Sequence, residues 1–314
     1  MIAHNNAPVL LIIFNRPDTT KQVFEVIRRA KPNKLYISAD APRLGNSNDS
    51  INCDKAREIV NKVDWDCEVQ YRFLEQNLGC GYGVSTAISW AFEKEDRLII
   101  LEDDCVPSLP FFRFCNFCLE KYKEDSRVWT INGRSHHQCH SVFKNSDYVF
   151  SRYTHCWGWA TWKRSWNQFD ISMKMWPDFY AAGGFCNTLL SFKEGRVFNK
   201  LYGKLCQDDK LKIHSWAYSF NFNFMSNGAL AIIPGKNLIH NIGYFGVHSN
   251  GKPSKATLLH AAEDYTFNKE PSFVLPNRAY ELYHFKHHMQ IIMGKQPLYK
   301  RVILKGLEIL GLRK

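Results

Sequence analysis

Apolar runs alternate with helix-like patterns through the first third of the chain. The runs from Val9 to Phe14, from Leu35 to Ala39 and from Leu98 to Leu101 are rich in branched and aromatic side chains. Such runs are typical of strands buried on both faces of a parallel sheet. Between the first two runs, Val23 and Ile27 lie on one face of a predicted helix. We therefore expect an α/β fold with a doubly wound, mostly parallel sheet over about the first 105 residues.

The segments between these runs continue the alternation. Asn46 to Asp54 is polar, which predicts a loop, and Lys55 to Val63 is expected to be a helix. A strand is expected over Glu68 to Phe73, followed by the glycine-containing stretch Asn77 to Gly83, in which Asn77 and Gly79 predict a tight turn. Helical spacing then resumes from Val84 to Phe92. The order is strand and helix in strict alternation.

Three consecutive acids follow the apolar run that ends at Leu101. Glu102, Asp103 and Asp104 would stand at the carboxyl end of a buried strand, where open α/β sheets bind ligands. Strand alternation would place Glu102 and Asp104 on one side and Asp103 on the other. Adjacent acids repel one another and are costly to bury, so a divalent cation such as Mg²⁺ or Mn²⁺ would relieve that cost. A strand that ends in a solvated acidic turn is the alternative.

The pattern changes after residue 108. Cys115 and Cys118 share one face of a predicted helix with Phe111 and Leu119, so core packing explains them. A zinc site is the weaker alternative, because paired zinc ligands usually lie on turns. Its further ligands would come from the downstream residues His136, His137, Cys139 and His140. From about Ser151 the chain becomes rich in Trp, Tyr, Phe and Gly.

Charge and cysteine content narrow the class of partner. The formal net charge of +11 favours anionic partners, but no block of like charges marks a nucleic-acid arm, so we expect no nucleic acid. The ten cysteines are scattered, as reduced thiols are in a cytoplasmic protein. The first apolar stretch is too short for a signal peptide or a membrane span. We expect a cytoplasmic protein.

Several blocks, taken in order, resemble bacterial sugar-nucleotide glycosyltransferases of the family 2 type, which have the fold called GT-A. The blocks are Ile13 to Pro17, Ser38 to Arg43, Asn77 to Gly79, Leu101 to Asp104, Cys156 to Trp162, Ser215 to Tyr218, Asn241 to Gly243 and Gly246 to His248. The resemblance extends from Pro8 to Ser249, and the ordered set is specific although each block alone is weak. A more distant similarity is to animal N-acetylglucosaminyltransferase I, which also carries Glu-Asp-Asp at this point.

The resemblance implies one GT-A domain over residues 1–294. Residues 1–108 would bind the nucleotide and residues 109–294 the acceptor. The implied activity transfers a sugar from a nucleotide-diphosphate sugar to a hydroxyl of a glycan or lipid-linked glycan, in bacterial surface polysaccharide or lipopolysaccharide synthesis. A single-displacement, inverting reaction is expected from the family. The enzyme would act in the cytoplasm or at the inner face of the cytoplasmic membrane.

Donor binding is expected at the carboxyl ends of the first strands. Asp104 is implied as the metal ligand, because the last acid of the trio ligates the ion in resembling enzymes, and His248 would complete the shell. Arg16 could fork onto a phosphate, and Asp40 is placed to accept from the imide N–H of uracil, so we prefer a UDP-sugar. The alternative for both residues is that they cap strand ends in water. The full set of expected nucleotide-sugar contacts is Phe14, Asn15, Arg16, Asp40, Arg43, Asn77, Gly79, Glu102 and Asp103.

Acceptor binding is expected from the aromatic-rich half. Flat ring faces for sugar stacking would come from Trp157, Trp159, Trp162 and Trp216, with Gly158 allowing close backbone approach. Core packing is the alternative for about half of these tryptophans, because Trp is the largest core residue. Related enzymes often carry an acid where this chain has Ala217. Asp209, or failing that Asp208, is therefore our candidate for the general base.

The tail and two rival functions complete the expectations. Residues 295–314 are expected to form a basic amphipathic helix that would suit an anionic membrane surface, or would dock on the protein. A sugar nucleotidyltransferase is one rival, although Asn15 to Asp18 is not the Gly-rich basic loop that such enzymes need. A non-catalytic carbohydrate-binding or nucleotide-sugar-binding protein is the other, and Ala217 is its best support.

Overall fold

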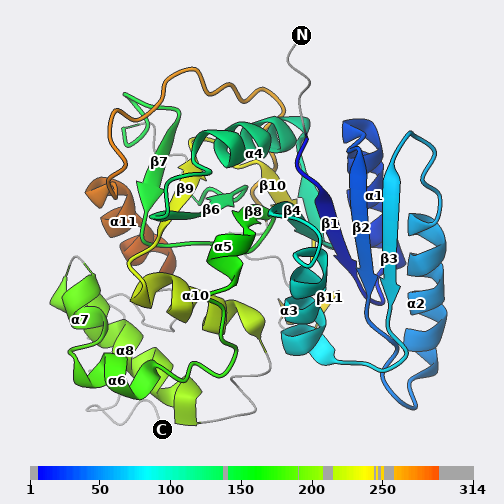
Figure 1. Ribbon diagram of the computed structural model, residues 1–314, viewed down its shortest axis with the longest axis horizontal. Coiled ribbons are helices and arrows are strands. Elements are labelled where there is room, and N and C mark those ends of the chain that lie inside the picture. The colour runs from blue at the N-terminus through cyan, green and yellow to red at the C-terminus, as the bar shows by residue number, and fades with distance from the viewer. Residues whose placement is uncertain are drawn as a thin grey trace, which may run out of the picture.

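One large sheet runs through the protein, whose computed structural model describes residues 6–136, 141–189, 191–207, 215–243, 245–246, 249–250 and 258–289 (Figure 1). Its eight strands lie in the order β3-β2-β1-β4-β8-β6-β9-β7. The strands of the sheet are β1 (Val9–Ile13), β2 (Lys34–Ala39), β3 (Glu68–Phe73), β4 (Arg97–Glu102), β6 (Val128–Asn132), β7 (Tyr148–Ser151), β8 (Trp159–Trp162) and β9 (Leu230–Pro234).

Two small antiparallel ribbons accompany the sheet. They are β5 (Cys105–Pro107) with β10 (Ile239–Asn241), and β11 (Phe245–Gly246) with β12 (Ser249–Asn250). The helices are α1 (Pro17–Ala30), α2 (Ser47–Val60), α3 (Gly79–Ala91), α4 (Leu109–Lys121), α5 (Lys163–Trp166), α6 (Trp176–Ala181), α7 (Phe185–Thr188), α8 (Phe192–Gln207), α10 (Trp216–Ser226) and α11 (Arg278–His284), followed by the π-helical turn η1 (Phe285–Met289).

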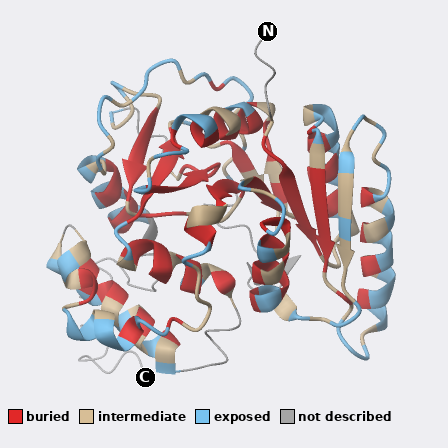
Figure 2. Cartoon of the chain, in the orientation of Figure 1, coloured by how far each residue is buried: buried red, intermediate tan, exposed pale blue. Residues whose placement is uncertain are grey.

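The first half of the sheet has the predicted doubly wound arrangement. β1 pairs in parallel with both β2 and β4, and β2 pairs in parallel with β3. The strands β1, β2 and β4 are buried on both faces, as the uninterrupted apolar runs indicate (Figure 2). Leu11 and Leu101 pack with α1, α2 and α4 on one face, whereas Leu10 and Ile100 pack with α3, α5 and α10 on the other. Successive side chains of these strands thus point to opposite faces of the sheet and contribute to two separate hydrophobic cores.

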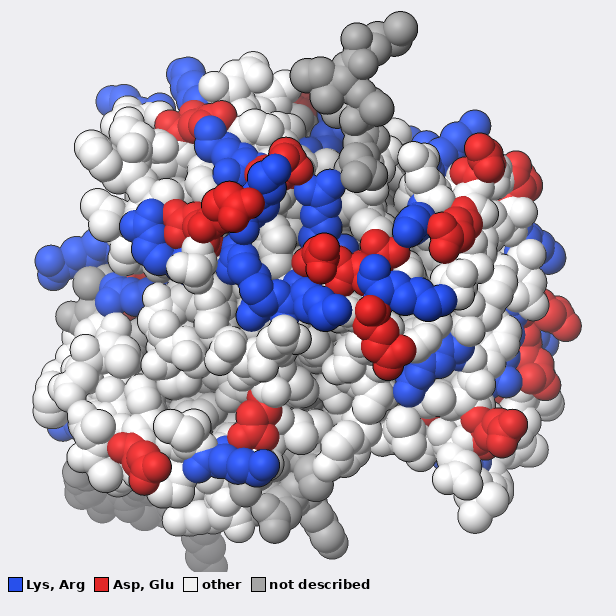
Figure 3. Space-filling view, in the orientation of Figure 1, with Lys and Arg blue, Asp and Glu red and all other residues white. Residues whose placement is uncertain are grey.

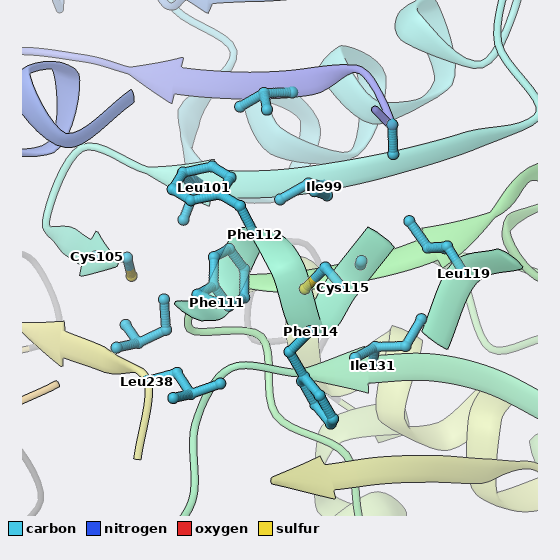
Figure 4. Packing of buried hydrophobic residues seen from close by; sticks show 14 of the residues in the cluster. Ile99, Leu101, Cys105, Phe111, Phe112, Phe114, Cys115, Leu119, Ile131 and Leu238 are labelled. Carbon is cyan, nitrogen blue, oxygen red and sulfur yellow. The ribbon is translucent and has the colours of Figure 1, made fainter. Parts of the chain in front are cut away.

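Helix α4 confirms the core interpretation of its cysteines. Cys115 and Cys118 are fully buried, together with Phe111 and Phe114. Figure 4 shows side chains of α4, such as Phe111 and Cys115, on the side of β4 that carries Ile99 and Leu101. Their apolar surroundings explain the face-sharing pattern without a metal ion.

The second half of the sheet is mixed. β8 is antiparallel to both β4 and β6, β9 is parallel to β6, and β7 is antiparallel to β9. A third apolar cluster, built largely of aromatic rings such as Phe185, Tyr202 and Phe222, joins this half to α6, α7, α8 and α11. Many of the aromatic residues after Ser151 therefore pack in this part of the core.

The helix after β2 begins earlier than the sequence pattern indicates. α2 starts at Ser47, so the predicted loop over Asn46 to Asp54 is wrong. The Asn46 side chain accepts a hydrogen bond from the backbone N–H of Asp49 (3.1 Å), which caps the helix. Its polar residues cover the exposed face, while Cys53, Ala56 and Val60 face inward.

Among the residues that the structure describes, no helix has the length and hydropathy needed to cross a bilayer.

Candidate active site

The carboxyl ends of β1, β2 and β4 meet at one edge of the sheet. Ile13 pairs with Ala39, and Ile12 pairs with Glu102. The residues that follow these strands therefore emerge side by side, although they come from three separate parts of the sequence. The acids thus lie at the carboxyl end of β4, a central strand that is parallel to β1, as the sequence predicts.

The acids do not divide between two sides as strand alternation would require. β4 ends at Glu102, and Asp103 and Asp104 lie in the turn that follows. One nitrogen of Arg16 (Nη1) reaches both carboxylates: Asp104 Oδ2 at 2.7 Å and Asp103 Oδ1 at 3.5 Å. The expected separation of Asp104 from Asp103 is therefore wrong, because the chain leaves the strand after Glu102, before either aspartate.

Burial and mutual repulsion make this acidic turn electrostatically unusual. Burial raises the pKa of Glu102 to about 8, and the charges of Asp104 and Asp103 act in the same direction. Burial and Asp104 likewise raise the pKa of Asp103 to about 7, against the opposing effects of Arg16 and the Phe14 N–H. The Phe14 N–H donates to Asp103 Oδ2 at 3.1 Å. Burial disfavours the charged Arg16 guanidinium, yet the neighbouring carboxylates raise its pKa overall.

The other side of Asp104 is held by the β5–β10 ribbon. Asp104 Oδ1 accepts hydrogen bonds from Asn241 Nδ2 (3.2 Å) and Cys105 Sγ (3.3 Å). The Ile242 N–H donates to the Asp104 carbonyl (2.8 Å). A Cβ on Gly243 would lie 2.1 Å from Asp104 Oδ2, so only glycine leaves room for this carboxylate. The sequence placed Asn241 to Gly243 in the resemblance but gave these residues no role.

Asp40 is committed to the local fold. Its carboxylate accepts from the N–H groups of Ala41 (2.9 Å), Leu78 (2.9 Å) and Gly79 (3.0 Å), and from Asn77 Nδ2 (3.2 Å). Four donors fill the acceptor capacity of a carboxylate. In this conformation Asp40 therefore has no acceptor left for the imide N–H of uracil, and Asn77 and Gly79 contribute to the same cap at the start of α3. Burial raises the pKa of Asp40.

A second cluster beside β1 centres on a residue that the sequence did not single out. Asp49 is buried and binds Arg43 Nη2 (2.9 Å) and Asn15 Nδ2 (2.7 Å). These hydrogen bonds, above all those from Arg43, lower the pKa of Asp49 to about 2. The Arg43 guanidinium also lies 5.8 Å from the Phe14 ring centre. The helix-capping pattern that begins at Asn46 was the one sequence signal that could have identified Asp49.

Three of the four predicted stacking tryptophans lie in the core. Trp159 and Trp216 stack on each other at 5.7 Å and are 1% and 2% exposed. Trp162 is 4% exposed, and its indole N–H donates to the Leu119 carbonyl (3.2 Å). Because their ring faces are covered, the prediction that these three stack on an acceptor sugar is wrong for this conformation.

Gly158 also serves the interior. It has a positive φ of 60°, and an added Cβ would lie 2.3 Å from Ile239 Cδ1. Its carbonyl accepts from the Gly133 N–H (2.8 Å). The close approach that Gly158 allows is therefore to β10, which carries Asn241, and the prediction of an acceptor contact is wrong.

Trp157 is the tryptophan of this block that keeps a partly exposed position. The guanidinium of Arg134 lies 4.9 Å from its ring centre. Arg134 follows β6 after one residue and is fully buried, and burial lowers its pKa to about 10. Since β6 runs in the same direction as β4, this cation–aromatic pair belongs to the carboxyl edge of the sheet.

Some predicted residues lie outside the described part of the chain. These are the candidate bases Asp208 and Asp209, the candidate ligand His248, the tail 295–314, and His137, Cys139 and His140 of the zinc alternative.

The acidic turn suits a divalent cation through its donor set. Mg²⁺ and similar hard ions commonly take one or two carboxylates and complete their shell with substrate phosphates and water. Among the described residues, no group of three His, Cys, Asp or Glu side chains is arranged to hold an ion unaided. Asp104 Oδ2, between Arg16 and the bare Gly243 backbone, is the oxygen that fits this role.

A hollow of about 980 Å³ lies at the opposite, amino edge of the sheet, and its lining carries both signs of charge. Ion pairs such as Arg97–Glu120 (2.7 Å) and Lys34–Glu95 (3.1 Å) line it. Figure 3 shows basic and acidic side chains interspersed in this way across the centre of the visible face. A lining of mixed sign does not select an anionic ligand.

Comparisons with known proteins find similarity to solved structures, but not to family models or to curated sequences. No family model matches the chain, and no curated protein matches it. The mannosyltransferase PcManGT from Pyrobaculum calidifontis, solved with GDP-Man and Mn²⁺, matches 57% of this chain with 10% identity and a TM-score of 0.36. The match spans 47% of the mannosyltransferase, about half its length.

Two further solved structures cover more of this chain. Mouse xyloside xylosyltransferase 1 matches 71% of it, and 82% of its own chain, with 11% identity and a TM-score of 0.34. Mannose-1-phosphate geranyltransferase from Thermus thermophilus matches 73% of both chains with 10% identity and a TM-score of 0.33.

Proposed function

We propose that the protein is a metal-dependent glycosyltransferase that uses a nucleotide-diphosphate sugar. The observation that carries this proposal is the convergence of Arg16, Asp103 and Asp104 at the carboxyl ends of two central parallel strands. A guanidinium and a carboxylate held together at this edge suit a diphosphate and its counter-ion. The ordered resemblance from Pro8 to Ser249 supports the same reaction.

Four residues at this edge have a stated role in the proposed reaction. Asp104 would bind Mg²⁺ or Mn²⁺, which supplies charge neutralisation for the leaving diphosphate. Arg16 would bind the diphosphate through its guanidinium fork, and Glu102 and Asp103 would face the ribose or sugar hydroxyls. We keep Asp209, with Asp208 as the alternative, as the proposed general base for the acceptor hydroxyl. His248 stays our proposal for a further metal ligand.

The contacts of Asp40 bear on which base the donor nucleotide carries. The preference for a UDP-sugar depends on Asp40, whose acceptors in this conformation already bind three backbone N–H groups and Asn77. Phe14 and Arg43 remain beside β1 as an aromatic face and a partly exposed cation. UDP-, GDP- and dTDP-sugars should therefore be tested equally.

The acceptor side is proposed from the resemblance and from Trp157. We propose a glycan or lipid-linked glycan of bacterial surface polysaccharide synthesis as acceptor, with the enzyme acting in the cytoplasm or at the inner membrane face. The basic tail 295–314 would bind anionic lipid. Equal binding of full-length and tail-truncated protein to anionic vesicles would contradict that part.

Turnover of candidate donors tests the proposal. Purified protein is incubated with each nucleotide sugar and Mn²⁺, and release of the nucleoside diphosphate is measured with and without EDTA. We expect metal-dependent release from one nucleotide family, reduced at least about 100-fold in Asp104→Asn, a loss typical of a transition-state charge contact. Asp64→Asn, which changes an acid paired with Arg28 at the surface, is the matched control and should keep full turnover.

Two outcomes would contradict the proposal. Formation of a nucleotide sugar and pyrophosphate from a nucleoside triphosphate and a sugar phosphate would identify a nucleotidyltransferase. Metal-dependent binding of a nucleotide sugar with no turnover of any donor, whatever acceptor is added, would identify a binding protein.

A further inference from the structure

The two oxygens of the Asp104 carboxylate have different partners. Oδ1 is held by Asn241 and by the buried thiol of Cys105, both part of the β5–β10 ribbon. Oδ2 is held by Arg16 and faces the bare backbone of Gly243. One oxygen is thus fixed by the fold, and the other by a single long side chain.

Arg16 combines an anchored backbone with a side chain that can change rotamer. Its carbonyl accepts from the Thr20 N–H (2.9 Å) and hydroxyl (2.7 Å), which fix it at the start of α1. Its side chain is 31% exposed, more than the side chains of Asp103 (10%) or Asp104 (18%). The guanidinium can therefore change partner without any movement of the strand or the helix.

We propose that Arg16 is a placeholder cation that occupies Asp104 Oδ2 in the donor-free protein and moves onto the diphosphate when a divalent cation takes that oxygen. The inference rests on the proposed function and adds an order of binding to it. The Asp104 carboxylate, only 18% exposed and beside two further acids, needs a compensating cation, and Arg16 supplies it until the metal–diphosphate pair arrives.

The exchange couples two binding events. A divalent cation that binds alone must displace Arg16 and leave the guanidinium without its carboxylate, so its affinity is low. A diphosphate that arrives with the cation offers Arg16 a new anionic partner, so the pair binds better than either component. The site would thus select the metal–nucleotide complex over the free ion.

Isothermal titration of Mn²⁺ alone, and then of UDP or GDP in saturating Mn²⁺, tests this exchange in the full-length protein. In Arg16→Gln we expect Mn²⁺ alone to bind about tenfold tighter, because its competitor is gone, and the diphosphate to bind about tenfold weaker. These opposite changes separate the exchange from a structural role, which would weaken both. Arg28→Gln, which removes a surface ion pair with Asp64, is the matched control and should change neither affinity.

Arg16→Lys provides a second variant in which the compensating charge is kept. We expect Mn²⁺ alone to bind as weakly as in the wild type, and the diphosphate to bind less well because the bidentate fork is lost. Unchanged or weaker Mn²⁺ binding in folded Arg16→Gln would overturn the inference. If the wild type binds no diphosphate with Mn²⁺, the proposed function fails, whereas the titration of Mn²⁺ alone still decides whether Arg16 competes for Asp104.

Discussion

At the scale of single residues, the acidic turn places three carboxyl groups together where little water reaches them. Burial and two neighbouring aspartates disfavour the charged form of Glu102 and raise its pKa. Asp49 shows the opposite case, since Arg43 and Asn15 favour its charged form. The two acids therefore predict opposite dependences of stability on pH.

Substituting Glu102 by Gln should stabilise the ligand-free protein at alkaline pH. The folded pKa of about 8 lies above the usual value of 4.5, so folding stability falls as pH rises between these values. With EDTA present, we expect the free energy of unfolding of Glu102→Gln to exceed that of the wild type by roughly 4 kcal/mol at pH 8.5, with the difference shrinking towards pH 5. Urea unfolding across this range measures it. Glu58→Gln, on the exposed face of α2, is the control, and an equal gain there would contradict the explanation.

Substituting Asp49 by Asn should destabilise the protein at neutral pH. The folded pKa of about 2 lies below the usual value of 3.8, so the carboxylate contributes stability above about pH 4 and loses it as pH falls towards 2. We expect a loss of about 1–2 kcal/mol at pH 6, allowing for the exposure of Arg43. Thermal unfolding of both proteins at pH 6 and pH 3 measures it, and a loss that does not shrink at the lower pH would contradict the ion-pair explanation.

Single residues were the part of the site that sequence predicted least well. The acids after Leu101 and the proximity of Arg16 follow from strand order, which the apolar runs show directly. The commitment of Asp40 to a helix cap, and the burial of Trp159, Trp162 and Trp216, depend on tertiary contacts that have no local pattern. A polar or aromatic residue type alone does not distinguish a ligand contact from an internal one.

At the scale of elements, the β5–β10 ribbon connects the acidic turn to the second half of the chain. Its contacts are tight: Gly133 and Gly158 both approach Ile239 of β10, where an added Cβ would lie within 2.5 Å of the isoleucine side chain. These glycines let β10 lie against β6 and β8, and that placement brings Asn241 to Asp104. The geometry of the acid thus depends on packing between elements far apart in sequence.

Gly158→Ala should therefore destabilise the fold strongly. The residue has a positive φ and its Cβ would overlap Ile239, so backbone strain and overpacking together should cost roughly 2–4 kcal/mol. Gly228→Ala is the matched control, because Gly228 has a φ of 65° but open space at Cβ, and strain alone should cost about 1 kcal/mol. Denaturant unfolding compares them.

A double-mutant cycle with Ile239→Ala separates the steric part. We expect Gly158→Ala and Ile239→Ala together to cost less than the sum of the single changes, because the smaller side chain makes room for the new methyl group. Additive costs would show that the contact with Ile239 is not the cause.

The N-terminus of α2 gives a further prediction at this scale. Asn46→Ala removes the side-chain acceptor for the Asp49 N–H and should cost about 1 kcal/mol. Asn46→Asp keeps an acceptor at the cap and should retain stability, so an equal loss in both variants in thermal unfolding would contradict the capping role. The sequence pattern missed this helix start because polar residues cover its outer face.

At the scale of the whole molecule, the site is a property of sheet topology. Parallel pairing brings the ends of β1, β2 and β4 together, and the return of the chain through β10 adds Asn241 from more than a hundred residues away. The parallel half could be predicted because its central strands are uninterrupted apolar runs. The mixed half could not, because the short strands β6 to β9 lack a period that indicates their partners or direction.

The most direct measurement is an anomalous difference map at the manganese edge, from crystals grown with Mn²⁺ and each of UDP and GDP. The account predicts one manganese peak about 2 Å from Asp104 Oδ2, bridged to a diphosphate that the Arg16 guanidinium also contacts. A nucleotide bound elsewhere, such as in the hollow at the amino edge of the sheet, or a diphosphate at this edge with Arg16 still on Asp104 and no manganese peak, would contradict it.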